Sequence, residues 1–400
     1  MQFTASIGEF QKLLQKTLPA VPPKSTLPVL EHLHFALSGN ELSVVASDQE
    51  ITIMSKINVT GSADGSVLVP GRRLSEIVKA LGSEGNIDFF SDEAKSDIKL
   101  QTTFGKYNMK GLDAEEYLDI PELFKSKPEY NIDTSHETTP SGASFTKDEI
   151  VRLAQSSGFA VATDEYRPAM TGMLFQFRGT YINAVSTDSF RLVKAVCKPE
   201  NASYPVDTDV IIPSRTTELM KKIDADSVFS FVKSQGKLTH IRIEYGNTML
   251  VSRLINEKFP PYETVIPTDS KVKAYADCRE VLSAIRRVSI FSNAISKQIR
   301  MAFDSEQITI IGEDEDSGTL ADEKIPCEFA GDRVQIGFNY KFLEEALHHI
   351  DADTEDKRVV FNFSDPNRPI IIKPDNDKEN LLMLIMPVRI SSSSTYNDED

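Results

Sequence analysis

The chain has 400 residues, 40% of them hydrophobic, which is enough to build the cores of several globular domains. Its 44 basic residues against 60 acidic ones give a net charge of −16, so the chain as a whole does not attract phosphate. Cys197, Cys278 and Cys327 lie far apart without a Cys-x-x-Cys pair, which argues against a disulfide framework or a cysteine zinc site. With no long apolar run and no secretory signal pattern at the start, we expect a cytoplasmic protein without membrane contact.

One order of elements occurs three times along the chain. Each copy begins with an amphipathic helix, continues with an alternating strand that ends in an acidic turn, and then has a short β run followed by a second helix. Thr146 and Asp277 are typical N-cap residues for two of these helices. The helices are predicted at 6–17, 71–81, 146–156, 214–224, 277–292 and 339–350, and the alternating strands at 42–48, 181–188 and 308–314.

This repetition predicts an α+β fold of three domains, each with two helices packed on antiparallel sheets, because both the helices and the sheets have one face to bury. We predict the domains at 1–130, 143–266 and 268–390. The polar stretches 125–142 and 267–270 are interpreted as linkers, and the acidic end 391–400 as a disordered tail.

Positive charge is concentrated on the predicted helices. Together they carry a small net positive charge, whereas the rest of the chain is strongly negative. If the helices share one side of the molecule, that side attracts phosphate while the remainder repels it. The alternative is that Lys and Arg occur there because both residues favour helix. Composition leaves both interpretations open.

Five short motifs, in the same order, resemble the bacterial sliding clamp, the beta subunit of DNA polymerase III. They are TLPVL at 26–30, TGMLF at 171–175, STD at 186–188 with Arg191-Leu192 after it, FPPY at 259–262 and MPVRI at 386–390. The resemblance implies a non-catalytic processivity factor with three clamp domains that form half of a ring. Two such chains would join head to tail as a homodimer around double-stranded DNA. The implied partners are the replicative DNA polymerase, the clamp loader and other proteins that carry clamp-binding peptides.

The resemblance also implies functional residues. The peptide-binding groove would be formed by Met170, Thr187, Ser189, Phe190, Arg191, Leu192, Pro260, Thr264, Val265, Leu384, Ile385, Met386, Pro387, Val388, Arg389 and Ile390. The residues expected to face DNA are Lys24, Arg72, Arg73, Lys79, Tyr166, Arg167, Arg215, Lys221, Lys222, Arg286 and Arg287. The dimer seam would join Tyr107 to Ile290 and Phe291.

Two features of the groove bear on this expectation. The family often has Gly-His where this chain has Ser189-Phe190, and the larger ring changes the expected shape of the groove. The apolar chain end around Met386 and Pro387 is also compatible with a plain core role, since terminal apolar strands are usually buried.

No catalytic, metal or cofactor site is expected. His32 and His34 alternate along a strand, and His348 and His349 are adjacent on a helix, so neither pair has the spacing of a typical zinc site. The acidic run 313–318 lacks the ligand spacing of a calcium loop and is interpreted as a solvated turn. The alternative to a clamp is a three-repeat peptide-binding scaffold that does not enclose DNA.

Overall fold

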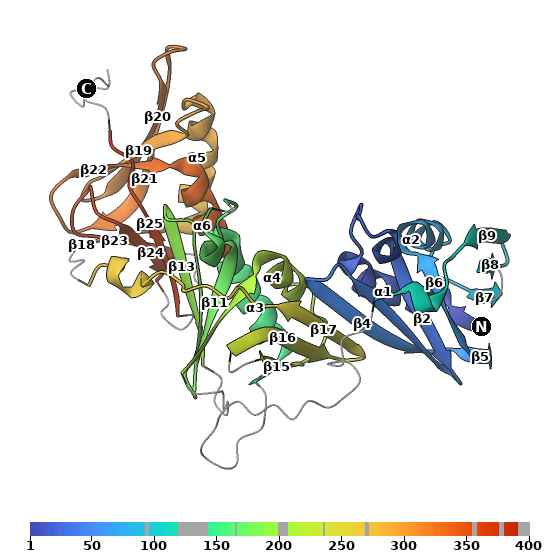
Figure 1. Cartoon of the computed structure of the whole chain (residues 1–400). Coiled ribbons are helices and arrows are strands. Elements are labelled where there is room, and N and C mark those ends of the chain that lie inside the picture. Colours follow the sequence, from blue (N-terminus) through green and yellow to red (C-terminus); the bar gives the residue numbers. More distant parts are fainter. Residues whose placement is uncertain are drawn as a thin grey trace. The chain divides into compact units, whose positions relative to one another are not determined.

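The structure is a computed structural model (Figure 1). It describes residues 1–92, 96–118, 143–164, 166–198, 207–234, 237–268, 272–353, 358–375 and 380–390. The linker expected at 125–142 and the tail expected at 391–400 lie outside the described residues, as does part of the linker expected at 267–270.

The three predicted repeats are present as similar sets of elements. The first contains β1 (Gln2–Ser6), α1 (Ile7–Thr17), β2 (His32–Ser38), β3 (Glu41–Ser47), β4 (Ile51–Asn58), β5 (Thr60–Ala63), β6 (Gly65–Pro70), α2 (Gly71–Ala80), β7 (Asn86–Asp92), β8 (Asp97–Gln101) and β9 (Lys106–Lys110). The second contains β10 (Ala143–Phe145), α3 (Lys147–Ser157), β11 (Gly172–Phe177), β12 (Ile182–Thr187), β13 (Arg191–Cys197), β14 (Thr208–Pro213), α4 (Ser214–Met220), β15 (Ser227–Ser234), β16 (Lys237–Tyr245) and β17 (Thr248–Arg253). The third contains β18 (Val272–Asp277), α5 (Cys278–Val288), β19 (Gln298–Phe303), β20 (Gln307–Asp314), β21 (Thr319–Phe329), β22 (Val334–Asn339), α6 (Tyr340–Asp353), β23 (Arg358–Phe363), β24 (Ile370–Pro374) and β25 (Leu381–Ile385).

These elements form two compact units. Unit 1 comprises 1–147 and 223–254, and unit 2 comprises 148–222 and 255–400. Unit 1 contains a five-stranded sheet, β5-β1-β7-β8-β9, and an eight-stranded sheet, β10-β15-β16-β17-β4-β3-β2-β6. Unit 2 contains a twelve-stranded sheet, β14-β11-β12-β13-β25-β24-β23-β18-β21-β20-β19-β22. The strand pairings in these sheets are antiparallel, so the predicted fold class is confirmed.

The helices pack on these sheets through one apolar face each. In unit 1, α1 packs against α2, and in unit 2, α5 packs against α6 (Figure 1). The buried face of α5 includes Val281 and Leu282, with Ile285 one turn further along the helix. The predicted N-cap Asp277 accepts hydrogen bonds from the backbone N–H groups of Arg279 and Glu280.

Helix ends differ from the predicted ones by more than one residue at three places. The second helix of the middle repeat ends at Met220, before the predicted 224, because the Lys221 and Lys222 amides turn back onto carbonyls of the last helical turn. The first helix of the third repeat ends at Val288 and continues as a 3-10 turn, η8 (Ser289–Phe291). The last helix extends to Asp353 instead of 350. None of the described helices is long and apolar enough to span a membrane.

Strands from neighbouring repeats pair with each other, and these two junctions position the candidate sites. In unit 1, β17 of the second repeat pairs with β4 of the first, with Ser252 opposite Ile51. In unit 2, β13 of the second repeat pairs with β25 of the third, with Arg191 opposite Ile385. Each junction therefore makes one continuous sheet from two repeats.

Candidate functional site

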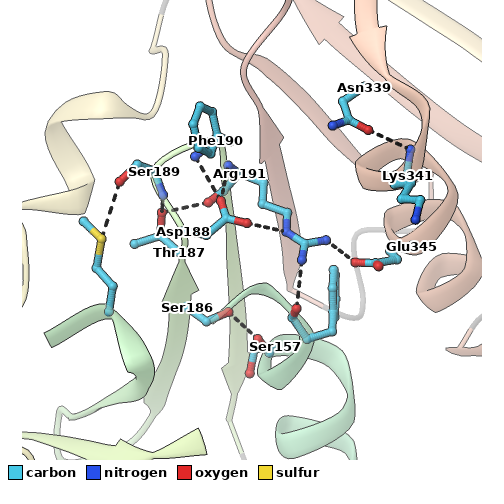
Figure 2. Close-up of polar contacts among 12 residues, drawn as sticks. Ser157, Ser186, Thr187, Asp188, Ser189, Phe190, Arg191, Asn339, Lys341 and Glu345 are labelled. Atoms are coloured by element: carbon cyan, nitrogen blue, oxygen red, sulfur yellow. Dashed lines mark hydrogen bonds and ion pairs between the residues drawn. The ribbon is translucent and has the colours of Figure 1, made fainter. Parts of the chain in front are cut away.

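The turn between β12 and β13 projects several of the expected groove residues from unit 2. The Asp188 carboxylate accepts hydrogen bonds from the amides of Phe190 and Arg191, both at 2.9 Å, and the Thr187 hydroxyl accepts one from the Ser189 amide (Figure 2). Ser189 has a φ of +79°, in the left-handed region that favours glycine. The Ser-Thr-Asp signature thus fixes a tight turn with Phe190 near its tip.

The Arg191 side chain is held by groups from both the second and the third repeat. Its guanidinium pairs with Asp188 at 3.0 Å and with Glu345 on α6, and donates to the Phe159 carbonyl at 3.0 Å (Figure 2). It also lies 5.4 Å from the ring centroid of Phe159 and 4.7 Å from that of Phe342. Only 11% of the Arg191 side chain is exposed, and its contacts link the second repeat to the third within the protein.

Phe190 and Met170 lie at the exposed rim of this region. The Phe190 ring is 61% exposed and stacks on Phe342 with 6.3 Å between centroids, and its carbonyl accepts the Met386 amide at 2.8 Å. On the other side, Arg167 donates to the Ser189 hydroxyl, and that hydroxyl lies 3.4 Å from the Met170 sulfur. The turn therefore connects the loop before β11, helix α6 and the segment after β25.

The other members of the expected groove divide into buried and exposed groups. Leu192 and Leu384 belong to a core cluster with Phe259 and Tyr262, and Ile385 is also buried. The exposed and half-buried members are Met170, Ser189, Phe190, Pro260, Thr264, Val265, Met386, Pro387, Val388, Arg389 and Ile390. Leu192, Leu384 and Ile385 are thus core residues, whereas Val265 and Met386, which are 49% and 38% exposed, offer apolar contact at the surface.

The final described residues run away from this turn along the third repeat. The Val388 amide donates to the Gly337 carbonyl at 2.8 Å, and a Cβ on Gly337 would lie 2.5 Å from the Val388 oxygen, so only glycine admits the chain here. Ile390 lines a separate hollow with Arg300, Glu313 and neighbouring residues. Residues 388–390 therefore anchor the chain end to β22.

The residues expected to face DNA differ in how their charges are used. Lys24, Arg73, Lys79 and Lys222 are exposed and make no ion pair with any described residue. Arg72 donates to the Val21 carbonyl, and Tyr166 is 94% exposed. The remaining members are placed as follows: Arg167 in the loop before β11, Arg215 exposed on α4, Lys221 paired with Glu218, Arg286 paired with Glu344 and Arg287 paired with Glu323.

The residues expected at the seam lie on two separate exposed edges. Tyr107 is on β9, which ends the five-stranded sheet of unit 1. Ile290 and Phe291, 78% and 41% exposed, lie on η8 of unit 2, next to β20 and β21. The sequence reading missed three further exposed apolar residues beside these edges: Phe104, Ile295 and Leu320. The sequence feature that could have identified them is a large apolar side chain in a turn or in an otherwise polar strand.

The titratable groups do not form a reactive centre in the part of the chain that the structure describes. Burial raises the pKa of the Cys197 and Cys327 thiols to about 11, so both thiols stay protonated at neutral pH. No group of three or more His, Cys, Asp or Glu side chains among the described residues is placed to hold a metal ion. The described residues around the β12–β13 turn therefore offer a surface for binding a partner, without groups arranged for catalysis.

Comparison with known proteins gives a consistent result over nearly the whole chain. The family models of the N-terminal, central and C-terminal domains of the DNA polymerase III beta subunit match residues 1–121, 144–261 and 263–389. The beta sliding clamps of Vibrio cholerae and Bacillus subtilis are 25% and 27% identical to this chain, covering 98% and 97% of it and 100% of their own lengths. A crystal structure of a sliding clamp from Pseudomonas aeruginosa bound to griselimycin is similar at a TM-score of 0.84 and 24% identity, covering 98% of this chain and 100% of that one.

Proposed function

Because this chain belongs to the DNA polymerase III beta subunit family, the bacterial sliding clamps, we propose that two copies close head to tail into a ring around duplex DNA. The chain is a sliding clamp, a non-catalytic processivity factor of DNA replication. The ring, its seam, its DNA-facing residues and its peptide groove are the parts of this proposal that remain to be tested.

The single observation that supports ring closure is the repeated pairing of strands between repeats. The strand that follows the acidic turn in the first repeat, β4, pairs with the last strand of the second repeat, β17. Its equivalent in the second repeat, β13, pairs with the last strand of the third, β25. The third equivalent, β21, pairs with β18 only near its end, at Cys327–Phe329, and the last strand of the first repeat, β9, lies at the edge of its sheet, so neither has such a partner in the described sheets. A second copy of the chain supplies the missing partner to each strand, and two such junctions close the ring.

The register of this junction follows from the two inside the chain. The repeats align on the pairs Phe3–Phe89, Ala143–Phe229 and Ala274–Phe361, each of which precedes its helix by the same spacing. Following the sheet registers from these pairs makes Ser252, Ile385 and Met109 equivalent. Gly61 lies opposite Phe3 and Phe329 lies opposite Ala274, and counting back equally along the chain from these two residues makes Ile51 equivalent to Thr319. Arg191 is equivalent to Ile51 because the two lie opposite the equivalent residues Ile385 and Ser252.

That register predicts the contacts across the seam. Thr319 of one copy would lie opposite Met109 of the other, Ala321 opposite Tyr107, and Asp322 opposite Lys106. A small residue would face a large ring, and an acid would face a base. Ile290 and Phe291, on the η8 turn beside β20 and β21, would add apolar area to the same junction.

The free basic residues support the DNA contact. Lys24, Arg73 and Lys79 of the first repeat and Lys222 of the second are exposed, without an ion pair among described residues. A few separated charges attract phosphate without a strong hold, which suits movement along the duplex. Closure of the ring, instead of affinity, would then prevent escape.

The region around the β12–β13 turn is proposed to receive short peptides of partner proteins. Met170, Phe190, Val265 and Met386 supply adaptable apolar contacts, and Arg389 is an exposed cation at the chain end. The proposed partners are the replicative DNA polymerase, the clamp loader and other proteins with clamp-binding peptides, in the cytoplasm. The proposed domain limits are 1–130, 143–266 and 268–390.

Retention on circular DNA tests the ring. The protein is loaded onto a nicked circular duplex with a clamp loader, and bound protein is counted before and after the circle is cut. A ring stays on the closed circle and leaves once ends exist. A peptide-binding scaffold that does not enclose DNA would show no dependence on ends, and that result would reject the proposal.

A further inference from the structure

The two arginines of α5 expected to face DNA are both paired with carboxylates from other elements. Arg287 makes a two-point pair with Glu323 of β21, with Nε–Oε1 at 2.8 Å and Nη2–Oε2 at 2.6 Å. Arg286 contacts Glu344 of the neighbouring helix α6 through Nε at 2.8 Å. The carboxylates come from elements distant in sequence, so the pairs depend on the tertiary fold.

In each pair the arginine is the more exposed partner. Arg286 and Arg287 are 52% and 61% exposed, whereas Glu344 and Glu323 are 34% and 31% exposed. The less exposed carboxylates therefore offset the charge of the more exposed guanidinium groups. The hydrogen bond from Arg287 lowers the pKa of the Glu323 carboxyl, so this carboxylate is ionised at neutral pH. Exposed ion pairs of this kind contribute little to stability, which leaves their effect on the surface potential as their main consequence.

Three basic residues of the first repeat are different in this respect, although Lys12 and Lys16 of α1 are also paired with carboxylates. Lys24, Arg73 and Lys79 are exposed and have no ion-pair partner among the described residues. Uncompensated positive charge is thus available at these three positions, whereas Arg286 and Arg287 offer hydrogen-bond donors whose charge is offset by a carboxylate. A neutralised arginine can still touch a phosphate, but it releases few counterions when it does so.

We propose that Glu323 and Glu344 are charge-masking residues that weaken the electrostatic hold of the third repeat on DNA. The first repeat then supplies most of the electrostatic attraction to DNA. The third repeat supplies a surface that DNA phosphates can contact without being held strongly. This inference rests on the proposed function, because it requires the exposed side of α5 to face the duplex.

The test measures how salt affects binding to a short duplex of arbitrary sequence. Unmasking one arginine should steepen the slope of log K against log salt by up to about 0.9 and tighten binding at low salt. Glu344→Gln is the preferred variant, because Glu323 lies on the proposed seam strand and its change could also affect dimerisation. The binding data for Glu323→Gln are interpreted only if size-exclusion shows an intact dimer. Glu306→Gln, an exposed change on the β19–β20 turn with the same charge difference, is the control.

The double variant Arg286→Gln with Glu344→Gln should return the slope to that of the wild type, because the unmasked charge is then absent. A Glu344→Gln slope equal to that of the Glu306→Gln control would overturn the inference. Charge reversal at Lys24 and Arg73 distinguishes a failure of the masking proposal from a failure of the proposed function. If reversal weakens binding while Glu344→Gln changes nothing, only the masking is wrong; if reversal also changes nothing, the helices do not face DNA and the proposed function fails.

Discussion

The Arg191 guanidinium lies 4.7 Å from the ring centroid of Phe342, and this contact joins the second repeat to the third. The same guanidinium reaches Asp188, Glu345 and the Phe159 carbonyl. One side chain thus combines ion pairing, hydrogen bonding and cation–π contact at a junction within unit 2.

Replacing Arg191 with Gln should therefore loosen this junction. The loss of charge-assisted hydrogen bonds around a largely buried group should cost about 1–3 kcal/mol of stability. Thermal unfolding of the whole chain measures the cost, and hydrogen exchange on β13 and β25 locates it. Arg191→Lys keeps the charge but loses the planar fork, so it should recover only part of the stability. Exchange that is unchanged on both strands would show that Arg191 does not hold the junction.

The apolar part of the proposed seam predicts assembly. Changing both Ile290 and Phe291 to Ala should give monomers, because the two side chains together contribute about 3–6 kcal/mol when covered. Both are exposed in the single chain, so the fold should remain intact. Analytical ultracentrifugation at low concentration gives the result, and a double variant that remains dimeric at nanomolar concentration would refute this seam.

The register of the seam predicts a charge exchange. Lys106→Glu should weaken the dimer, because it would place a carboxylate opposite Asp322. Asp322→Lys in the same chain should restore dimerisation by reversing the pair. Dimer dissociation constants of the single and double variants form the measurement. Failure of the second change to rescue the first would mean that the strands pair in another register.

The local parts of this fold were predictable from sequence, and the long-range parts were not. Helix faces and the alternating strands follow from periods of a few residues, so the repeats and the N-cap at Asp277 were found. The pairing of β17 with β4 joins residues nearly 200 positions apart, such as Thr248 and Ser55, and no local pattern specifies it.

The candidate site shows the same division. The Ser-Thr-Asp phrase predicted a turn, and the turn is present with Asp188 as its acceptor. From sequence, Arg191 was expected to contact a bound peptide, but its partner Glu345 follows 154 residues later, so its internal role could only be seen in the fold. Likewise, exposure distinguishes the surface residue Met386 from the core residue Leu384, although only Ile385 separates them in the sequence.

The DNA-facing assignment predicts a salt-sensitive loss. Replacing Lys24, Arg72, Arg73 and Lys222 with Glu should weaken loading and processivity while folding and dimerisation remain intact, since all four are exposed. Each single change should be small. Processive synthesis at several salt concentrations tests this, with circular dichroism and size-exclusion as controls. Unaltered salt-dependent DNA association in the fourfold variant would contradict the assignment.

Burial of His34 predicts a pH dependence of stability. Burial lowers the pKa of its imidazole, and its Nδ1 has no hydrogen-bond partner among the residues that the structure describes. In the unfolded chain the ring takes up a proton near its ordinary pKa of 6.5, whereas the folded ring does so only at lower pH. The unfolded state therefore binds more protons below that value, and stability falls as the pH decreases. Urea unfolding between roughly pH 7 and pH 5 should show a flatter decline for His34→Gln, but not for a control change at the exposed His348.

The groove predicts a separation between binding and stability at the chain end. Met386 and Val265 are exposed, so changing each to Ala should weaken binding of a partner-derived peptide by about tenfold with little change in melting, consistent with the loss of one apolar contact.

Deleting 386–390 should have a larger effect on both peptide binding and stability, because the Met386 amide donates to Phe190 and the Val388 amide to Gly337. We expect the truncated chain to lose peptide binding and some stability of the third repeat, yet to remain dimeric, since the proposed seam lies on β9 and β21. Fluorescence anisotropy of a labelled peptide, with melting and size-exclusion on the same samples, separates these effects. Tight peptide binding by both alanine variants would place the docking surface elsewhere.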